Sequence, residues 1–184
     1  QLVQGVAASH DMRATFMAKP YAETAGNGMH WHVSLVDEEG RNLFDNGGEA
    51  GSETLRNAVG GVLQVLPESM AFQAPNINAF RRFRPGLFVP MTRSWGYNNR
   101  SAALRIPGGP SAARRLEFRV AGADANPYLA LATLLAGIHH GVAGQLAAPA
   151  PITGNACLEP DAGMPLQIHA ALHSLQKARG LPAY

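Results

Sequence analysis

Arginine side chains are concentrated in one segment of this 184-residue sequence. Between Met70 and Ala123, nine arginines and a single acidic residue, Glu117, make a net charge of +8, in a chain whose net charge is +2. A guanidinium presents a planar fork of donors that matches carboxylate and phosphate oxygens. So many guanidiniums with one acid among them predict the binding of anions from outside the segment. The nine are Arg81, Arg82, Arg84, Arg93, Arg100, Arg105, Arg114, Arg115 and Arg119.

Three stretches, residues 29–35, 101–106 and 115–120, place apolar and polar side chains on alternate sides. That period is typical of a strand with one buried face. If the three strands lie in one sheet, their shared polar face is a candidate site. Its members are His30, His32 and Ser34 on the first strand, Arg105 on the second, and Arg115, Glu117 and Arg119 on the third.

His30 and His32 have the spacing of metal ligands on a strand, because residues two apart lie on the same side. Such a pair is more often structural, and Glu117 between arginines also fits a structural salt bridge. Imidazole and carboxylate together favour a hard divalent cation, although two ligands are too few for a tight site. Four other histidines are interpreted as structural or solvent-facing: His139, His140, His169 and His173.

The composition, 46% hydrophobic and 15% charged, is that of one globular domain. No apolar run reaches the roughly 18 residues of a membrane span, so no membrane partner is expected. The single cysteine, Cys157, allows no internal disulfide and favours a reducing, cytoplasmic location. The pI near 9 is weak support for nucleic-acid binding, because the charge is confined to one segment. The sequence begins like the tail of a helix and without Met, which favours a fragment.

Further elements must position the three strands. Caps, breakers and apolar periodicity predict their boundaries. They are the end of a helix in residues 1–10, a short strand at 14–18, a turn at 25–28, a partner strand at 42–44, a helix from the Ser52 cap that Pro67 ends or kinks, a buried helix from Asn126 to about Leu146 that is apolar nearly all round, and a last helix at 166–179.

Four blocks, in family order over about residues 10 to 145, resemble the signatures of the glutamine synthetase family. Each block alone is weak, but together they are specific. The first is Lys19-Pro20 with Gly26-x-Gly28-Met29-His30-x-His32-x-Ser34, the second Asn78-x-x-x-Arg82-x-x-Pro85-Gly86, the third Asn99-Arg100-Ser101-Ala102-x-x-Arg105-Ile106-Pro107, and the fourth Arg115-Leu116-Glu117-x-Arg119 with residues 126–132.

The resemblance implies an α+β catalytic domain, with an antiparallel sheet that has helices packed on one face. It also implies an ATP-dependent ligase that phosphorylates the γ-carboxylate of glutamate, after which an amine displaces the phosphate. Mg²⁺ or Mn²⁺ would assist, and active sites would form between subunits of a homo-oligomeric ring. Carried over by position, the resemblance implies His30 and Glu117 as metal ligands, His32, Val33, Ser34, Arg100 and Arg105 as ATP contacts, Gly26, Arg82, Phe88 and Arg119 as substrate contacts, and Arg100 and Arg119 as catalytic residues.

Departures from the family pattern refine the expected substrate. Ammonia-using members have a glutamate two residues after the Pro-Gly of the second block, where this sequence has Phe88. A phenyl ring can neither hold ammonium nor accept its proton, so an organic amine or polyamine is expected. The asparagine before the first glycine of the turn is replaced by Ala25, and residues 111–113 lack the lysine expected before Arg115.

The resemblance further implies that residues 1–184 are part of a catalytic domain, with other metal-binding glutamates and a small N-terminal β-grasp domain preceding Gln1. The alternatives are an ammonia-using glutamine synthetase, which Phe88 disfavours, and a phosphotransferase on a related fold, which the Asn99-Arg100-Ser101 block disfavours. Two further alternatives are a non-enzymatic relative, against which His30, Glu117 and Arg119 argue, and a nucleic-acid module; no nucleic-acid partner is expected, because the positive charge is confined to one segment.

Overall fold

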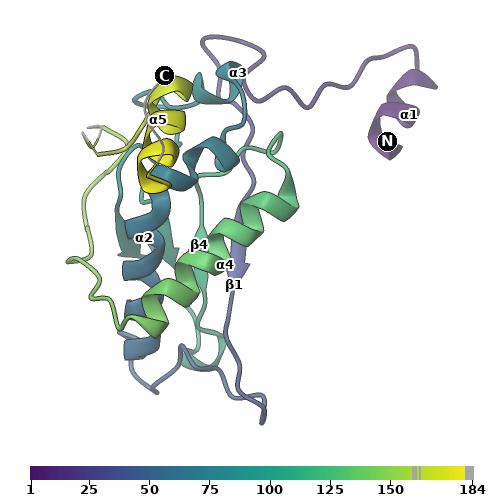
Figure 1. Ribbon diagram of the computed structural model, residues 1–184. Helices are drawn as coiled ribbons and strands as arrows, with labels where there is room; N and C mark the ends of the chain where they lie inside the picture. Colours follow the sequence, from purple (N-terminus) through teal and green to yellow (C-terminus); the bar gives the residue numbers. More distant parts are fainter. Residues whose placement is uncertain (159–160, 162, 181–184) are drawn as a thin grey trace.

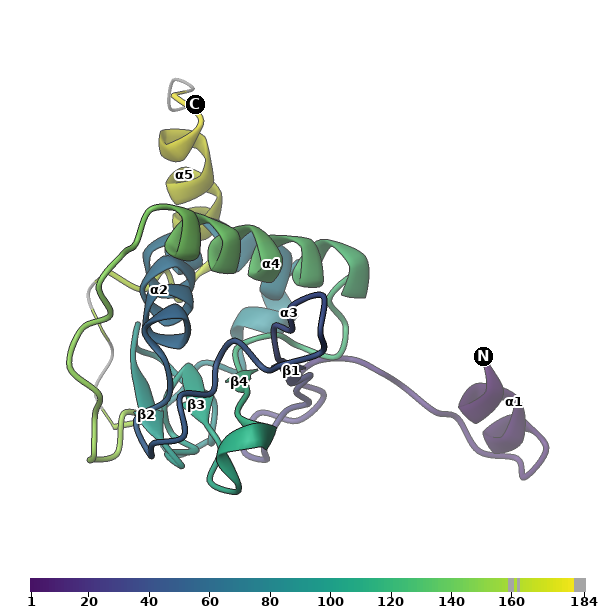
Figure 2. The ribbon, with the colours of Figure 1, turned by 90° about the horizontal axis from the view of Figure 1, so that it is seen from below.

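A computed structural model describes residues 1–158, 161 and 163–180 of the protein. Its centre is a four-stranded sheet in the order β1-β4-β3-β2 (Figure 1). The antiparallel pairs are β1 with β4 and β4 with β3, whereas β2 and β3 are parallel. Helices α2 and α4 lie over one face of the sheet (Figure 2). The strands are β1 (Trp31–Val33), β2 (Trp95–Tyr97), β3 (Leu104–Ile106) and β4 (Leu116–Phe118).

The predicted α+β class is confirmed, with one difference in the sheet. Antiparallel strands were expected, but the chain between β2 and β3 returns to the beginning of β2. The amide of Leu104 then donates to the carbonyl of Ser94 at 3.0 Å, and the amide of Asn98 donates to the carbonyl of Ile106 at 2.8 Å. These bonds hold the two strands in the same direction, so the sheet is mixed.

The two long helices begin where side chains satisfy their first amides. Ser52 Oγ accepts from the amide of Leu55 at the start of α2 (Glu53–Gln73). Asn126 Oδ1 accepts from the first amides of α4 (Pro127–Ala143). Pro67 does not end α2, which continues for six residues beyond it. The remaining helical segments are α1 (Leu2–Ala8), α3 (Ile77–Phe80), a 3₁₀ turn (Ser111–Ala113) and α5 (Ile168–Ala178).

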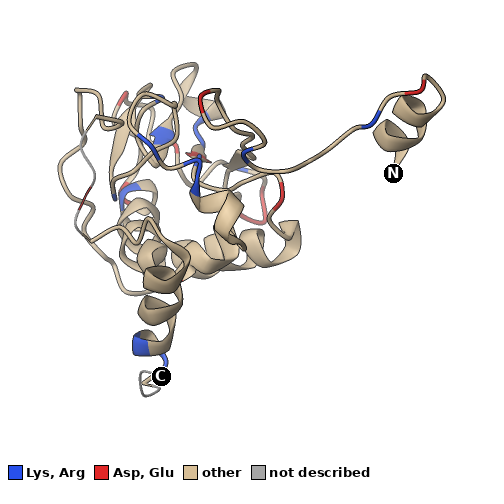
Figure 3. Cartoon of the chain, turned by 90° about the horizontal axis from the view of Figure 1, so that it is seen from above, with Lys and Arg blue, Asp and Glu red and all other residues tan. Residues whose placement is uncertain are grey.

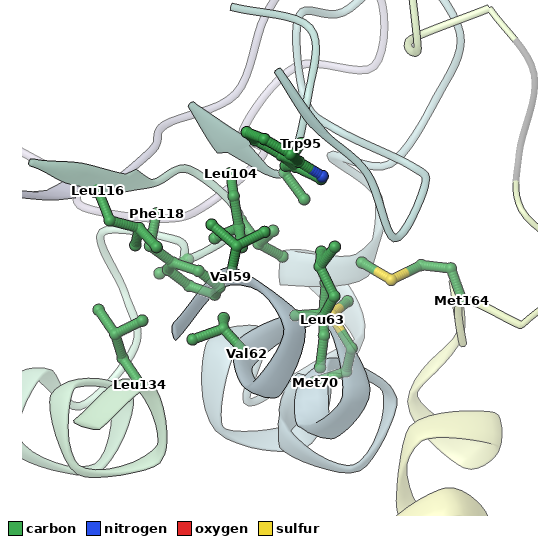
Figure 4. Packing of buried hydrophobic residues seen from close by; sticks show 14 of the residues in the cluster. Val59, Val62, Leu63, Met70, Trp95, Leu104, Leu116, Phe118, Leu134 and Met164 are labelled. Atoms are coloured by element: carbon green, nitrogen blue, oxygen red, sulfur yellow. The ribbon is translucent and has the colours of Figure 1, made fainter. Parts of the chain in front are cut away.

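The hydrophobic core lies between the sheet and α2. Leu104, Leu116 and Phe118 point from the strands toward Val59 and Val62 of α2 (Figure 4). The three strand residues are nearly fully buried. The predicted apolar faces of these strands are therefore confirmed, and the opposite face of the sheet is left to polar side chains.

Helix α4 is buried along one stripe only, whereas the sequence predicted burial all round. Tyr128, Leu129 and Leu135 are exposed, and the helix ends at Ala143, before Leu146. Helix α2 packs against one side of α4, and the other side of α4 faces solvent. Within the residues that the structure describes, no helix is long and apolar enough to cross a membrane. The buried stripe consists of Ala130, Leu134, Gly137, Ile138 and Gly141.

Two predicted strands are wrong. Residues 14–18 form no strand, and the side-chain amide of Asn27 donates to the carbonyls of Phe16 and Met17 instead. Residues 42–44 contribute a single bridge, between Asn42 and Val36. A strand needs a neighbour along its length, and these segments find none among the described residues. Helix α1 is present as predicted, but none of its residues is buried and it lies apart from the body (Figures 1 and 2).

Glycines bring α2 and α4 into close contact. A Cβ at Gly61 would overlap the backbone of Gly137 and Gly141, and one at Gly137 would lie 2.9 Å from Val65 Cγ2. A Cβ at Gly141 would overlap the carbonyl oxygen of Asn57. The separation of the two helices, and hence the position of α4 relative to the sheet, depends on the absence of a Cβ at these three glycines.

We expect Gly61→Ala and Gly141→Ala each to lower the free energy of unfolding by about 1–3 kcal/mol, because the added methyl group overpacks the interface. This loss exceeds the gain of up to about 1 kcal/mol that alanine brings to a helix. Chemical denaturation measures the change. Gly5→Ala in α1 is the control, since a Cβ there meets nothing within 4 Å. Equal stability of Gly61→Ala and Gly5→Ala would contradict the packing argument.

Candidate active site

The polar faces of three strands meet at one point of the sheet, as predicted. His32 of β1 and Arg105 of β3 both lie opposite Glu117 of β4. Glu117 is 3% exposed, although it carries a charge. Charged residues gather in the strands and loops, whereas α4 has no Lys, Arg, Asp or Glu (Figure 3). The sheet thus separates the apolar core, which its strands share with the buried face of α2, from an ionic face.

Two guanidiniums hold the Glu117 carboxylate. Arg105 Nη1 donates to Oε2 at 2.7 Å, and Arg119 Nη1 donates to Oε1 at 2.7 Å. Burial by itself would raise the pKa of the Glu117 carboxyl, but the hydrogen bonds and charges of Arg105 and Arg119 outweigh it and hold that pKa below its ordinary value. Glu117 is therefore ionised at neutral pH. The two hydrogen bonds, one to each carboxylate oxygen, fix the orientation of the carboxylate.

His30 lies at the edge of this ion cluster. Its Nδ1 is 3.2 Å from Glu117 Oε1 and 3.4 Å from Arg119 Nη1. Burial and the nearby Arg119 charge lower the pKa of His30, although Glu117 opposes them. A neutral imidazole is the form that ligates a metal. Because its side chain is 40% exposed, His30 and the Glu117 oxygen beside it could together hold a divalent cation.

The described residues supply only these two ligands at one place. Among them, no group of three or more His, Cys, Asp or Glu side chains is placed to hold a metal ion. Carboxylate oxygen plus imidazole is a donor set that suits Mg²⁺ or Mn²⁺, so the residues present fit such an ion in kind. They are too few to bind it tightly, which agrees with the sequence interpretation.

His32 and Ser34 continue the polar face beyond Glu117. Arg115 Nε donates to His32 Nδ1 at 3.1 Å, which leaves Nε2 to carry the proton when the ring is neutral. Ser34 Oγ donates to the carbonyl of Arg114 and borders a cavity of about 720 Å³. Val33 does not join them, because its side chain packs against the core on the opposite face.

Arg82 lies beside Gly26 and the segment that follows β4. Arg82 is 1% exposed, and its guanidinium donates to backbone carbonyls, at 2.9 Å in the case of Val120. Burial lowers the pKa of Arg82 to about 10 against the opposing charge of Asp124, so the group remains charged at neutral pH. A Cβ at Gly26 would lie 2.9 Å from Arg82 Cγ. Arg82 therefore fills the structure behind Gly26 and presents no open face to a ligand.

Arg100 and Phe88 extend into solvent. Arg100 borders a cavity of about 370 Å³ that is also lined by residues 151–153, and its carbonyl accepts from Arg119 Nε at 3.1 Å. Phe88 is 81% exposed and has a φ of +60°, two residues after Gly86 at +78°. The left-handed region costs a residue with a side chain about 1–2 kcal/mol, so the loop holds this ring outward against local strain.

Two residues at the site were not given a role by the sequence. Arg115, which orients His32, was on the predicted polar face, so its strand phase could have identified it. Asn98 Oδ1 accepts from Arg105 Nη2 at 2.7 Å and fixes the second end of that guanidinium. Nothing local identifies Asn98, because its partner comes from the neighbouring strand.

The arrangement of histidine, glutamate and arginine on one sheet face agrees with a family match over nearly the whole chain. The family described as glutamine synthetase, catalytic domain, matches residues 1–183. The chain belongs to the glutamine synthetase family. The resemblance carried by the four sequence blocks is thereby confirmed.

Similar proteins within the family include ligases of organic amines. The chain is 48% identical over 168 residues to the gamma-glutamylputrescine synthetase PuuA of Escherichia coli, covering 91% of this chain and 35% of that protein. It is 42% identical over 166 residues to the gamma-glutamylethanolamide synthetase GlnA4 of Streptomyces coelicolor, covering 90% and 35%. A glutamate–isopropylamine ligase of a Pseudomonas species is 38% identical, covering 97% and 39%. The chain thus spans about a third of the length of the curated relatives it matches.

Solved structures agree with the fold. The complex of GmaS with ADP superposes with a TM-score of 0.85 at 32% identity, over 99% of this chain and 45% of that one. GmaS without ligand has a TM-score of 0.83. The sheet and helices of this glutamine synthetase family member therefore have the arrangement found in a nucleotide-binding relative.

We expect Glu117→Gln to lower the free energy of unfolding at pH 7 by about 3 kcal/mol, because it leaves the buried Arg119 and the largely buried Arg105 without a counter-charge. Folding lowers the pKa of Glu117, so the ionised carboxylate stabilises the wild type above the ordinary pKa of 4.5, and this contribution is lost as the pH falls through the lower folded value. The variant should therefore lose less stability than the wild type on acidification. Denaturation at several pH values measures both effects.

The matched control is Asp37→Asn, which removes a carboxylate from the solvent-exposed pair with Arg41. Exposed pairs contribute little, so its stability at pH 7 should stay close to that of the wild type. If Glu117→Gln changes stability no more than Asp37→Asn does, the Glu117 ion cluster does not stabilise the fold.

Proposed function

We propose that this chain carries part of the active site of an ATP-dependent carboxylate–amine ligase that forms a γ-glutamyl amide through a γ-glutamyl phosphate. The observation that supports this most is the ionised Glu117 between Arg105 and Arg119, with His30 at 3.2 Å. Such a cluster suits phosphoryl transfer, in which charge on oxygen is stabilised by cations already in place. Family membership and the names of the amine-ligase relatives support the same activity.

In this proposal the polar face binds Mg·ATP or Mn·ATP. His30 and Glu117 would hold the cation, which when bound would draw charge from phosphate oxygens. His32 and Ser34 would contact the nucleotide beside the cavity that Ser34 borders, and Val33 would contribute through its backbone. We also propose that further cation ligands come from outside these 184 residues, because the described part of the chain offers no third one here.

Arginines would stabilise the two charged stages of the reaction. A γ-carboxylate oxygen of glutamate attacks the terminal phosphorus of ATP, and ADP leaves. The amine nitrogen then attacks the acyl carbon, the bond between that carbon and the phosphate oxygen breaks with its electron pair remaining on phosphate, and the proton lost by the nitrogen is taken up by the departing phosphate. Arg100 and Arg105 would pair with the phosphoryl oxygens, and Arg119, which contacts both Glu117 and the Arg100 carbonyl, would hold the reacting groups together.

The amine would bind beside Phe88. This ring is exposed on the loop where ammonia-using members have a carboxylate, and it suits an amine with a carbon tail. Gly26 would line the glutamate site, with Arg82 supporting it from behind. The homo-oligomeric ring with active sites between subunits, expected from the resemblance, is retained as part of the proposal.

Ammonia use is the second candidate. A glutamine synthetase of Halobacterium salinarum is 44% identical over 137 residues, which is 73% of this chain. Glutamine synthetases as well as ligases of organic amines are therefore similar to this chain. The identity of the residue at position 88 distinguishes the two, because only a carboxylate there could accept a proton from ammonium.

The product of the complete open reading frame that contains this chain should release phosphate from ATP with glutamate, Mg²⁺ and an organic amine. We expect turnover with putrescine, ethanolamine or isopropylamine to exceed that with ammonium by at least about tenfold, since Phe88 can neither hold ammonium nor take its proton. Parallel phosphate-release assays measure the ratio. Equal or faster turnover with ammonium would overturn the choice of substrate, and no turnover with any amine would count against ligase activity.

Phe88→Glu should shift that preference toward ammonium, because it restores a carboxylate at the exposed position. We expect the ratio of ammonium to organic-amine turnover to rise, with glutamate KM little changed. Leu87→Glu, one residue earlier in the same loop, is the control for added charge. A similar shift in both variants would show that position 88 has no special part in choosing the amine.

The isolated 184-residue chain should show no ligase activity and should bind Mn²⁺ weakly, because two protein ligands are too few for a tight site. Calorimetric titration of Mn²⁺ into the chain measures the affinity. Tight binding would mean that the chain supplies cation ligands besides His30 and Glu117. His30→Ala tests whether any weak binding that is observed involves this site.

A further inference from the structure

The loop that precedes His30 is held by residues from a distant part of the chain. We call residues 19–28 the glycine loop, since it contains Gly26 and Gly28. Its last residue is next to the segment that enters β1, and a Cβ at Gly28 would lie 3.7 Å from His30 Nε2. The glycine loop therefore borders the His30 ring.

Asn78 of α3 pairs with the first residue of the glycine loop in both directions. The amide of Lys19 donates to Asn78 Oδ1 at 2.8 Å, and Asn78 Nδ2 donates to the carbonyl of Lys19 at 2.9 Å. The side-chain amide of Asn78 thus makes the pair of hydrogen bonds that a neighbouring strand would make with the backbone of Lys19 in a sheet. Both the position and the direction of the chain at Lys19 are determined by this pair, because each group has one partner of the required kind.

Arg82, one helical turn after Asn78, holds the other end of the loop. Its guanidinium donates to the carbonyls of Asn27 at 3.4 Å, Val120 at 2.9 Å and Ala121 at 3.5 Å. Asn27 belongs to the glycine loop, whereas the other two residues follow β4. The amide of Met29 also connects the end of the glycine loop to the segment after β4, because it donates to the carbonyl of Ala121 at 2.9 Å.

The two ends of the glycine loop are therefore attached to one short segment, residues 78–82. Asn76 caps this segment by accepting from the amide of Ala79 at 2.9 Å, and its Nδ2 donates to Asp124 Oδ2 at 2.8 Å. The segment is thus anchored independently of the loop. A shift at Asn78 would be transmitted through Lys19 to the loop, and from the loop to His30 beside Glu117.

We propose that Asn78 is a positioning residue which, together with Arg82, sets His30 against Glu117 through the glycine loop. Asn78 does so without touching a substrate. The kinetic consequence rests on the proposed ligase function, whereas the effect on the loop does not. The assignment also explains why the half-buried side-chain amide of Asn78 both accepts from and donates to one residue 59 positions earlier in the chain.

The test compares Asn78→Ala with Gln73→Ala in the product of the complete open reading frame. Gln73 likewise has a hydrogen-bonded side-chain amide, and it is 1% exposed, but its Nε2 donates to Thr133 Oγ1 and joins α2 to α4. Both variants lose a side chain that is hydrogen-bonded inside the protein, half-buried at Asn78 and buried at Gln73, so both should destabilise the protein. Only Asn78→Ala should loosen the glycine loop. Asn78→Asp, which keeps the acceptor for the Lys19 amide and loses the donor, replaces Asn78→Ala if the latter does not fold.

Hydrogen–deuterium exchange and steady-state kinetics give two separate readouts. In Asn78→Ala, amides of residues 19–33 should exchange at least about tenfold faster and kcat/KM should fall about tenfold, the range typical of lost supporting contacts around a metal ligand. In Gln73→Ala, neither quantity should change, although the melting temperature falls.

Unchanged exchange of residues 19–33 in Asn78→Ala overturns the proposal, and so does a loosened loop with unchanged kcat/KM. An equal kinetic loss in Gln73→Ala also overturns it, since general destabilisation would then suffice. A wild-type protein without ligase activity would refute the proposed function, and the exchange rates would still decide whether Asn78 holds the loop.

Discussion

The site depends on the buried negative charge of Glu117, which two positively charged arginines balance. Glu117 is almost completely removed from water, and an unpaired carboxylate there would cost several kcal/mol. Arg105 from β3 and Arg119 from the end of β4 supply the compensation at 2.7 Å each. Because the donors come from two strands, the ion cluster forms only when those strands are correctly paired. The ion pair between Arg105 and Glu117 therefore forms only in the observed register of β3 and β4.

The helical layer makes this register rigid. The strand side chains that alternate with Arg105 and Glu117 are Leu104, Leu116 and Phe118, and they are buried against α2. A slip of one residue would turn the ionic face toward the helices. Close contact at the glycines of α2 and α4 limits how far the layer below can adjust. Polar chemistry on one face is thus maintained by apolar packing on the other.

Arginines of the same segment have different tasks, although the sequence presents them alike. Arg82 is buried and holds backbone carbonyls, Arg105 is divided between Glu117 and Asn98, and Arg100 reaches into solvent. The first supports a loop, the second orients a carboxylate, and the third remains open to an anion. The net charge of the segment therefore overstates how many guanidiniums a ligand could meet.

The α+β class, the polar strand faces with His30, Arg105 and Glu117, and the starts of α2 and α4 could all be predicted from the sequence. These features follow from the period of two along a strand and from caps whose partners are two or three residues away. Family membership followed from motifs in a fixed order.

Only the tertiary structure decided the parallel pairing of β2, the solvent exposure of one side of α4, the inward direction of Arg82 and the pairing of Asn78 with Lys19. Each of these depends on partners far away in the chain. A long side chain or a single amide has many local conformations of similar energy, and contacts with distant segments select one of them.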